Sequence, residues 1–132
     1  ADYVPSPRAE YQQYADKLRA EAPVFGSLMM EGTDICSLWP YHPKANPGPY
    51  EAKGSAPIVV IGTKYDPATP YHWAQNLHKT LSNSVLLTWE GDGHTAYGKA
   101  GSCLNDPVDQ YLLTGKVPQD GLVCPASPKS GS

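Results

Sequence analysis

The feature that most constrains the fold of this chain is a short apolar run, PIVVIG, at residues 57–62. The run does not alternate between apolar and polar residues, and its central residues are β-branched. This composition is typical of a strand that is buried on both faces, as strands of a parallel sheet are. Such a strand needs neighbouring strands along its edges and other elements over both faces.

The residues that follow predict a helix and a second strand. Residues 71–81 carry apolar side chains four positions apart, which predicts a helix with one face in the core: Trp73, Leu77 and Leu81. The run SVLLTW at residues 84–89 then predicts a second buried strand.

A second helix is predicted at residues 105–115. Asp106 suits the N-cap, Pro107 suits the first helical position, and Gly115 suits the position just after the last turn. Residues 57–115 therefore alternate strand, helix, strand and helix, which predicts an α/β fold with parallel strands.

Residues 1–56 do not supply the remaining strands of such a sheet. Residues 7–21 predict a helix, residues 24–39 fit either a short helix or irregular chain, and residues 40–57 are a proline-rich connection. We therefore expect the chain to be one part of a larger α/β fold, with the rest on another polypeptide or cut away.

Composition excludes some function classes. The formal net charge of the 132-residue chain is −3 and there is no basic run, which disfavours nucleic-acid binding. No apolar run approaches the roughly 18 residues of a membrane span. The three cysteines, Cys36, Cys103 and Cys124, leave either a free thiol or a partner outside the chain.

Two polar side chains follow the two predicted strands. Asp66 comes after the first strand, and His94 comes after the second in the stretch GDGHTAY. Loops that follow neighbouring parallel strands lie at the same edge of the sheet, so these side chains can come within hydrogen-bond reach. An acid that orients a histidine is part of a Ser-His-Asp triad, and the order acid then histidine is that of the α/β-hydrolases. The alternative is a surface turn with an incidental histidine.

Other polar residues are weaker candidates. Asp92 lies between glycines on the same loop as His94, and we interpret it as a turn residue. His72 and His78 are six residues apart rather than the four of a zinc-binding helix, so we interpret them as surface residues. His42 lies in the proline-rich connection without evident partners. We expect no metal and no cofactor.

Four longer motifs carry a family resemblance. They are CSLWP at 36–40, GTKYDPATP at 62–70, GDGHT at 91–95, and the ending D-x-Y-L-x-x-G-x-x-P…G-x-x-C at 109–124. Over about residues 35–124 the chain resembles the C-terminal region of the tripeptidyl aminopeptidase-like α/β-hydrolases. These are secreted or cell-envelope serine exopeptidases, grouped with the proline iminopeptidases.

The resemblance implies that Asp66 and His94 are the acid and the base of a catalytic triad. It also implies a nucleophilic serine in a G-x-S-x-G turn, and the sequence contains no such pentapeptide. Ser27, Ser55 and Ser102 each lack the second glycine. We therefore expect the serine on an upstream part of the same protein, with peptides as substrates and with this chain inactive by itself. The alternatives are an esterase of the same superfamily, and a non-catalytic fragment or binding module.

The same resemblance suggests a division into three segments: the end of a cap or lid region at 1–56, a hydrolase segment at 57–124, and a flexible tail at 125–132. It also suggests a location outside the cell or in the bacterial envelope. Cys103 and Cys124 flank the predicted second helix and the turn after it, so we expect them to form a disulfide. Cys36 would then find its partner in the upstream part.

Overall fold

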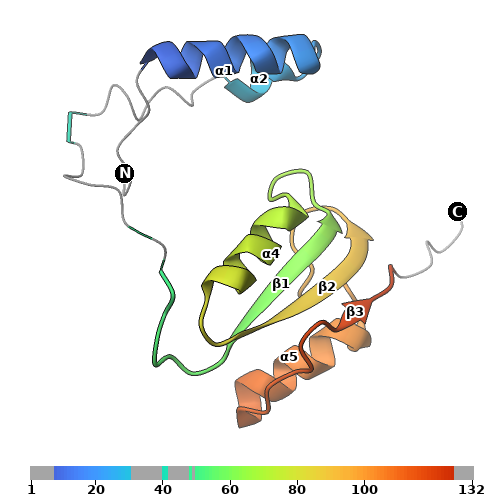
Figure 1. Cartoon of the computed structure of the whole chain (residues 1–132). Coiled ribbons are helices and arrows are strands. Elements are labelled where there is room, and N and C mark those ends of the chain that lie inside the picture. Colours follow the sequence, from blue (N-terminus) through green and yellow to red (C-terminus); the bar gives the residue numbers. More distant parts are fainter. Residues whose placement is uncertain (1–7, 31–39, 42–47, 49, 127–132) are drawn as a thin grey trace, which may run out of the picture. The chain divides into compact units, whose positions relative to one another are not determined.

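The structure is a computed structural model that describes residues 8–30, 40–41, 48 and 50–126. The chain forms two compact units, residues 1–48 and residues 49–132 (Figure 1). The assignment of residues 1–56 to a cap or lid region stays a prediction. Cys36 and His42 lie outside the described residues.

The first unit contains two helices, α1 (Arg8–Glu21) and α2 (Gly26–Met30). Helix α1 matches the predicted helix closely, and Ala15 is its buried residue. The chain then turns back so tightly that a Cβ atom on Gly26 would lie 2.4 Å from the carbonyl oxygen of Leu18. Only a glycine allows α2 to approach α1 in this way.

The second unit is built on three parallel strands in the order β1 (Ile58–Tyr65), β2 (Ser84–Asp92) and β3 (Val123–Cys124). The α/β fold with parallel strands is thus confirmed. Strand β3 was not predicted, because two residues are too few to show a period. Strand β1 pairs only with β2 among the described residues, so its other edge is open.

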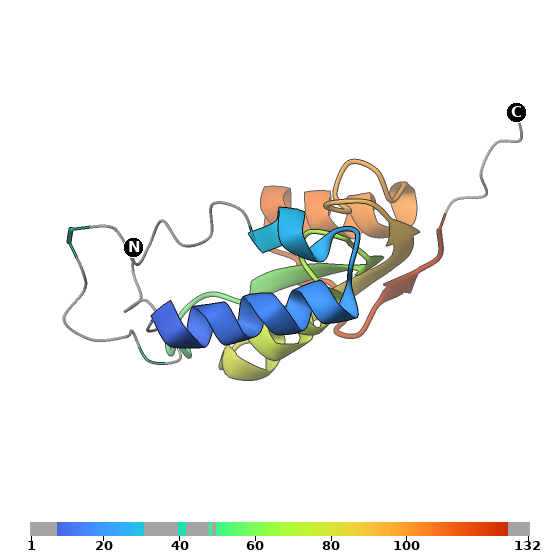
Figure 2. The same ribbon diagram turned by 90° about the horizontal axis from the view of Figure 1, so that it is seen from above.

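Helices α4 (Tyr71–Thr80) and α5 (Ser102–Thr114) lie on opposite faces of this sheet (Figures 1 and 2). On the α4 face, the Tyr71 hydroxyl group is 2.6 Å from Thr88 Oγ1. On the other face, a buried apolar cluster joins β2 to α5 and to the loop before it: Leu87, Trp89, Ala96, Ala100, Leu104, Val108 and Cys124.

The predicted start of the second helix was wrong. Helix α5 begins three residues earlier, at Ser102, and Pro107 lies inside it. The first turn is formed by Leu104 N–H and Asn105 N–H donating to the Gly101 carbonyl oxygen at 3.3 and 3.0 Å. Because Leu104 is completely buried in the core, its burial outweighs the hydrogen bond that a proline cannot donate. The helix does end at Gly115, whose backbone is left-handed.

The prediction that Trp73 and Leu77 belong to the core was also wrong. Trp73 is 55% exposed and Leu77 is 50% exposed, while Leu81 is half-buried. Both exposed side chains line a cavity beside the open edge of β1. The apolar face of α4 therefore exists, but no described residue covers its outer half.

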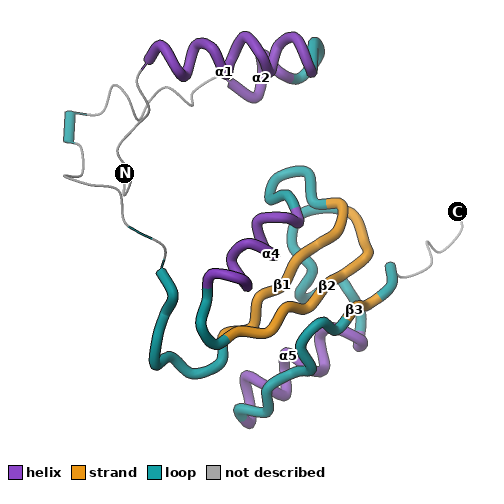
Figure 3. Tube along the Cα trace, viewed as in Figure 1, coloured by secondary structure: helices purple, strands orange, loops and turns teal. Residues whose placement is uncertain are grey.

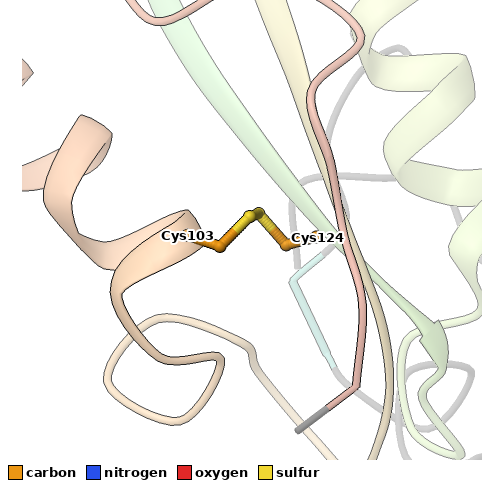
Figure 4. The surroundings of a disulfide bond; sticks show 2 residues. All are labelled: Cys103 and Cys124. Atoms are coloured by element: carbon orange, nitrogen blue, oxygen red, sulfur yellow. A yellow bond between two sulfur atoms is a disulfide. The ribbon is translucent and has the colours of Figure 1, made fainter.

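A disulfide joins Cys103, in the first turn of α5, to Cys124 in β3 (Figure 4). The bond closes a sequence separation of 21 residues. It fixes the short third strand against the helix whose preceding loop carries His94. Within the described part of the chain, no helix has the length and apolar character needed to cross a membrane.

Candidate active site

The loops that follow β1 and β2 leave the sheet at the same end (Figure 3). Asp66 is the first residue after β1, and His94 is the second residue after β2. His94 Nδ1 lies 3.0 Å from Asp66 Oδ2 and 3.2 Å from Asp66 Oδ1. The two residues singled out in the sequence therefore contact each other, with the carboxylate on the Nδ1 side of the imidazole.

The Asp66 carboxylate is enclosed by hydrogen-bond donors from its own loop. Its Oδ1 accepts from Ala68 N–H at 2.8 Å and from Thr69 N–H at 2.9 Å. Its Oδ2 accepts from the Thr69 hydroxyl group at 2.7 Å and from Thr95 N–H at 3.3 Å. An aspartate that bonds the backbone two and three residues ahead closes a tight turn, which orients its own side chain.

Opposing effects act on the pKa of Asp66. Burial disfavours the charged carboxylate, but the hydrogen bonds from Thr69, Ala68 and His94 outweigh burial and lower the pKa well below its usual range. Asp66 is thus an anion at neutral pH, and an anion can only accept hydrogen bonds. A neutral His94 beside it carries its proton on Nδ1, which leaves Nε2 free to accept a proton.

Burial differs sharply between the two partners. The Asp66 side chain is 3% exposed, whereas the His94 side chain is 56% exposed. A buried carboxylate behind an accessible imidazole is an arrangement compatible with general-base chemistry, because the free side of the imidazole can be reached from outside.

Two residues with positive φ flank His94. Gly93 has φ 91° and Thr95 has φ 66°. This region is easy for glycine, but for a β-branched residue such as threonine it costs on the order of 1–2 kcal/mol. The peptide group between His94 and Thr95 is also contacted by a lysine: Lys99 Nζ donates to the His94 carbonyl oxygen at 2.7 Å.

Three polar residues at this site were not predicted from the sequence: Thr69, Thr95 and Lys99. Thr69 had a detectable signal, since a threonine three residues after an aspartate can close a turn on that side chain. The roles of Thr95 and Lys99 depend on backbone dihedral angles that no pattern of residue types reveals.

The remaining candidates lie elsewhere or contact other groups. The interpretation of Asp92 as a turn residue was wrong, because Asp92 is the exposed last residue of β2. Asp66 is the carboxylate that contacts His94 Nδ1. His72 is exposed as predicted. His78 is half-buried, contrary to prediction, because its Nδ1 lies 2.8 Å from Ser84 Oγ and its Nε2 lies 3.7 Å from Asp120 Oδ1.

Neither a nucleophilic serine nor a metal site is evident in the described ranges. Ser27 lies in α2, Ser55 precedes β1, and Ser102 opens α5, so none occupies a strand-to-helix turn. No cluster of three or more histidine, cysteine, aspartate or glutamate side chains in those ranges could hold a metal ion.

Three parallel strands with helices on both faces are the C-terminal portion of an α/β-hydrolase fold. A family model described as "TAP-like protein" matches residues 22–124. The chain therefore belongs to the TAP-like family of serine hydrolases.

Relatives in this family have several activities in their names. Carboxylesterase B of Mycobacterium tuberculosis is 32% identical over 123 residues, which are 91% of this chain and 24% of the relative. Serine protease Hip1 of the same species is 39% identical over 89 residues, or 67% and 17%. Tripeptidyl aminopeptidase of Streptomyces lividans is 34% identical over 90 residues, again 67% and 17%. The chain thus spans about a quarter or less of the curated relatives it matches.

Proposed function

We propose that this chain is the C-terminal part of a secreted serine hydrolase and supplies Asp66 and His94 of a Ser-His-Asp triad. The observation that carries the proposal is the contact of 3.0 Å between His94 Nδ1 and the buried Asp66 carboxylate. The nucleophilic serine belongs to the upstream part of the same protein.

In this proposal the serine Oγ attacks the substrate carbonyl carbon while His94 Nε2 removes the hydroxyl proton. His94 then gives that proton to the leaving group as the bond to the leaving group breaks. Water repeats both steps on the acyl-enzyme and regenerates the serine. Asp66 holds the imidazole in the required tautomer and stabilises the imidazolium ion that forms in each half of the reaction.

We propose an exopeptidase that releases short peptides from free N-termini. Similarity to tripeptidyl aminopeptidase and to a serine protease supports a peptide substrate. An esterase is the second candidate, and the carboxylesterase B match, which covers more of this chain, supports it. An acid–histidine pair serves either reaction, because both proceed through an acyl-enzyme.

The open edge of β1 supports docking of the upstream part. A cavity of about 400 Å³ runs along this edge and includes Trp73 and Leu77 together with Asp66. On the other side of β1, a cavity of about 470 Å³ includes Tyr111 and Leu112. A parallel strand of this length with apolar groups on both sides is ordinarily buried inside a larger sheet.

A location outside the cell or in the bacterial envelope is part of the proposal. The disulfide between Cys103 and Cys124 supports it, because disulfides persist in oxidising compartments and are rare in the cytosol.

The test is to express residues 1–132 alone and together with the upstream part, and to assay both on tripeptidyl and acyl chromogenic substrates. We expect turnover only when the upstream part is present, and loss of turnover in the His94→Ala variant. His72→Ala is the matched control, since His72 is an exposed histidine on α4. Serine-type turnover by the isolated chain, or full activity of His94→Ala, would refute the proposal. A preference for acyl esters over peptides would favour the esterase, and a complete protein without turnover would favour a non-catalytic module.

A further inference from the structure

The peptide unit between His94 and Thr95 is held at both of its polar ends. Its N–H group, on Thr95, donates to Asp66 Oδ2 at 3.3 Å. Its carbonyl oxygen, on His94, accepts from Lys99 Nζ at 2.7 Å. Because the N–H and C=O groups of a trans peptide unit point in opposite directions, the two bonds together oppose rotation of the unit.

This restraint acts on a backbone that would otherwise relax. The positive φ of Thr95, 66°, is unfavourable for a β-branched residue. Lys99 Nζ also lies 3.5 Å from Thr95 Oγ1, so the same ammonium group contacts both residues of the unit. A change at this peptide would move His94 relative to Asp66, since the imidazole is attached next to it.

The backbone of Lys99 is held in a tight turn next to the apolar cluster. Its backbone N–H donates to the Ala96 carbonyl oxygen at 2.9 Å, and the N–H of Ala100 donates to the same oxygen at 2.9 Å. Ala96 and Ala100 are both buried in the apolar cluster. The lysine Cα is therefore fixed to the core, although the side chain is exposed.

We propose that Lys99 is a positioning residue for the base. Its ammonium group holds the His94–Thr95 peptide unit in its strained conformation and so keeps His94 Nδ1 on the Asp66 carboxylate. Lys99 touches none of the reacting atoms and acts through the backbone of His94. The inference rests on the proposed function, in which His94 is the general base.

The first test uses the complete protein with the upstream part present. We expect Lys99→Met, which removes the ammonium donor but keeps a long side chain, to lower kcat about 10- to 100-fold, as small misplacements of a catalytic group do. KM and the unfolding midpoint should change little, and Lys99→Arg should recover most of kcat because it restores a charged donor. Lys116→Met is the matched control, since Lys116 is an exposed lysine beyond α5.

A second measurement does not depend on turnover. The proton shared between His94 Nδ1 and Asp66 is expected to give a low-field NMR resonance in the same complete protein. We expect this resonance to shift or broaden in Lys99→Met and to persist in Lys99→Arg and Lys116→Met. If the wild-type protein hydrolyses no substrate but Lys99→Met alters the resonance, only the proposed function fails.

Three results would overturn the role of Lys99. The first is a Lys99→Met variant with the same resonance as the wild type. The second is wild-type kcat in that variant of an active protein. The third is a loss of kcat in Lys99→Met that Lys99→Arg does not recover and that is accompanied by a lower unfolding midpoint of Lys99→Met. Such a loss would come from a less stable fold and not from a misplaced His94.

Discussion

At the scale of single residues, Asp66 and Asp92 differ in one respect that matters for catalysis: the Asp66 carboxylate contacts the His94 imidazole, whereas Asp92 lies two residues before His94 at the end of β2. We expect Asp66→Asn to lower kcat on the order of 10⁴-fold in the complete protein, as the same change does in a serine protease, because the amide stabilises the wrong imidazole tautomer. Asp92→Asn should cost far less, since Asp92 is the exposed last residue of β2 and Asp66 is the carboxylate on His94 Nδ1. Steady-state kinetics of both variants provides the test, and a crippled Asp92→Asn beside a silent Asp66→Asn would contradict the assignment.

The lowered pKa of Asp66 predicts how stability depends on pH. The carboxyl pKa lies below its unfolded value of about 3.9, so the ionised group stabilises the folded state fully above that pH. This contribution is lost as the pH falls toward the folded pKa. We therefore expect the urea midpoint of the wild-type chain to fall more steeply between about pH 5 and pH 2 than that of Asp66→Asn.

Asp106→Asn is the control for this pH series, because Asp106 is exposed on α5. Its midpoint should follow the wild-type curve. Parallel curves for the wild type and Asp66→Asn would mean that the hydrogen bonds to this carboxylate do not favour its charged form.

The central pair of the site could be predicted from sequence, whereas its supporting contacts could not. Asp66 and His94 each follow an apolar strand, and topology alone brings the ends of neighbouring parallel strands together. Lys99 contacts the site only because the loop after His94 turns back on itself, and Thr95 matters only because of its φ. Both properties are set by three-dimensional packing, to which residue types are a poor guide.

At the scale of elements, Gly91 in β2 leaves the space that the buried indole ring of Trp89 occupies. A Cβ atom on Gly91 would lie 2.2 Å from the indole ring of Trp89, which is buried in the core. We expect Gly91→Ala to lower the free energy of unfolding by about 1–3 kcal/mol, the usual cost of overpacking. Urea denaturation followed by circular dichroism measures the change.

Gly48→Ala is the matched control for that measurement. Among the residues that the structure describes, a Cβ atom on Gly48 would have no neighbour within 4 Å, and Gly48 does not have a positive φ. A similar loss of stability in both variants would show that the effect is general to glycine replacement and is unrelated to Trp89.

The disulfide between Cys103 and Cys124 restricts the unfolded chain, so its removal should lower stability. We expect the double variant Cys103→Ser and Cys124→Ser to unfold at lower denaturant, with a loss of about 3 kcal/mol by the chain-entropy relation for a loop of this size. Thiol counting under denaturing, non-reducing conditions checks the bond itself. Three free thiols in the wild-type chain would contradict both the bond and the proposed oxidising compartment.

Elements with a clear period were predictable, and elements set by long-range contacts were not. The positions of β1, α4 and β2 follow from apolar runs and four-residue spacing. The start of α5 was predicted too late because Asp106 and Pro107 are good local signals for a helix start. Burial of Leu104 in the core, a tertiary contact, instead favours a helix that begins at Ser102.

At the scale of the whole molecule, the open edge of β1 predicts where the upstream part binds. In the isolated chain, backbone N–H groups on the outer side of β1 should exchange rapidly with solvent deuterium. Adding the upstream part should protect them, because a neighbouring strand would accept their hydrogen bonds. Amides of α1, in the other compact unit, serve as the reference, and unchanged exchange along β1 in an active complex would contradict strand pairing at this edge.

The contact between Asp66 and His94 lies entirely within the unit formed by residues 49–132. If this pair belongs to a triad, as we propose, its location reduces what assembly of the active site requires. Three separate groups would need two independent alignments. Under the proposed function one alignment remains, that of the proposed serine against the preformed Asp66–His94 pair. Upstream parts with different substrate pockets could then each use the same Asp66–His94 pair for proton transfer. The relatives of this one short chain are named as an aminopeptidase, a protease and an esterase, which is the range of names that the proposed role would lead us to expect.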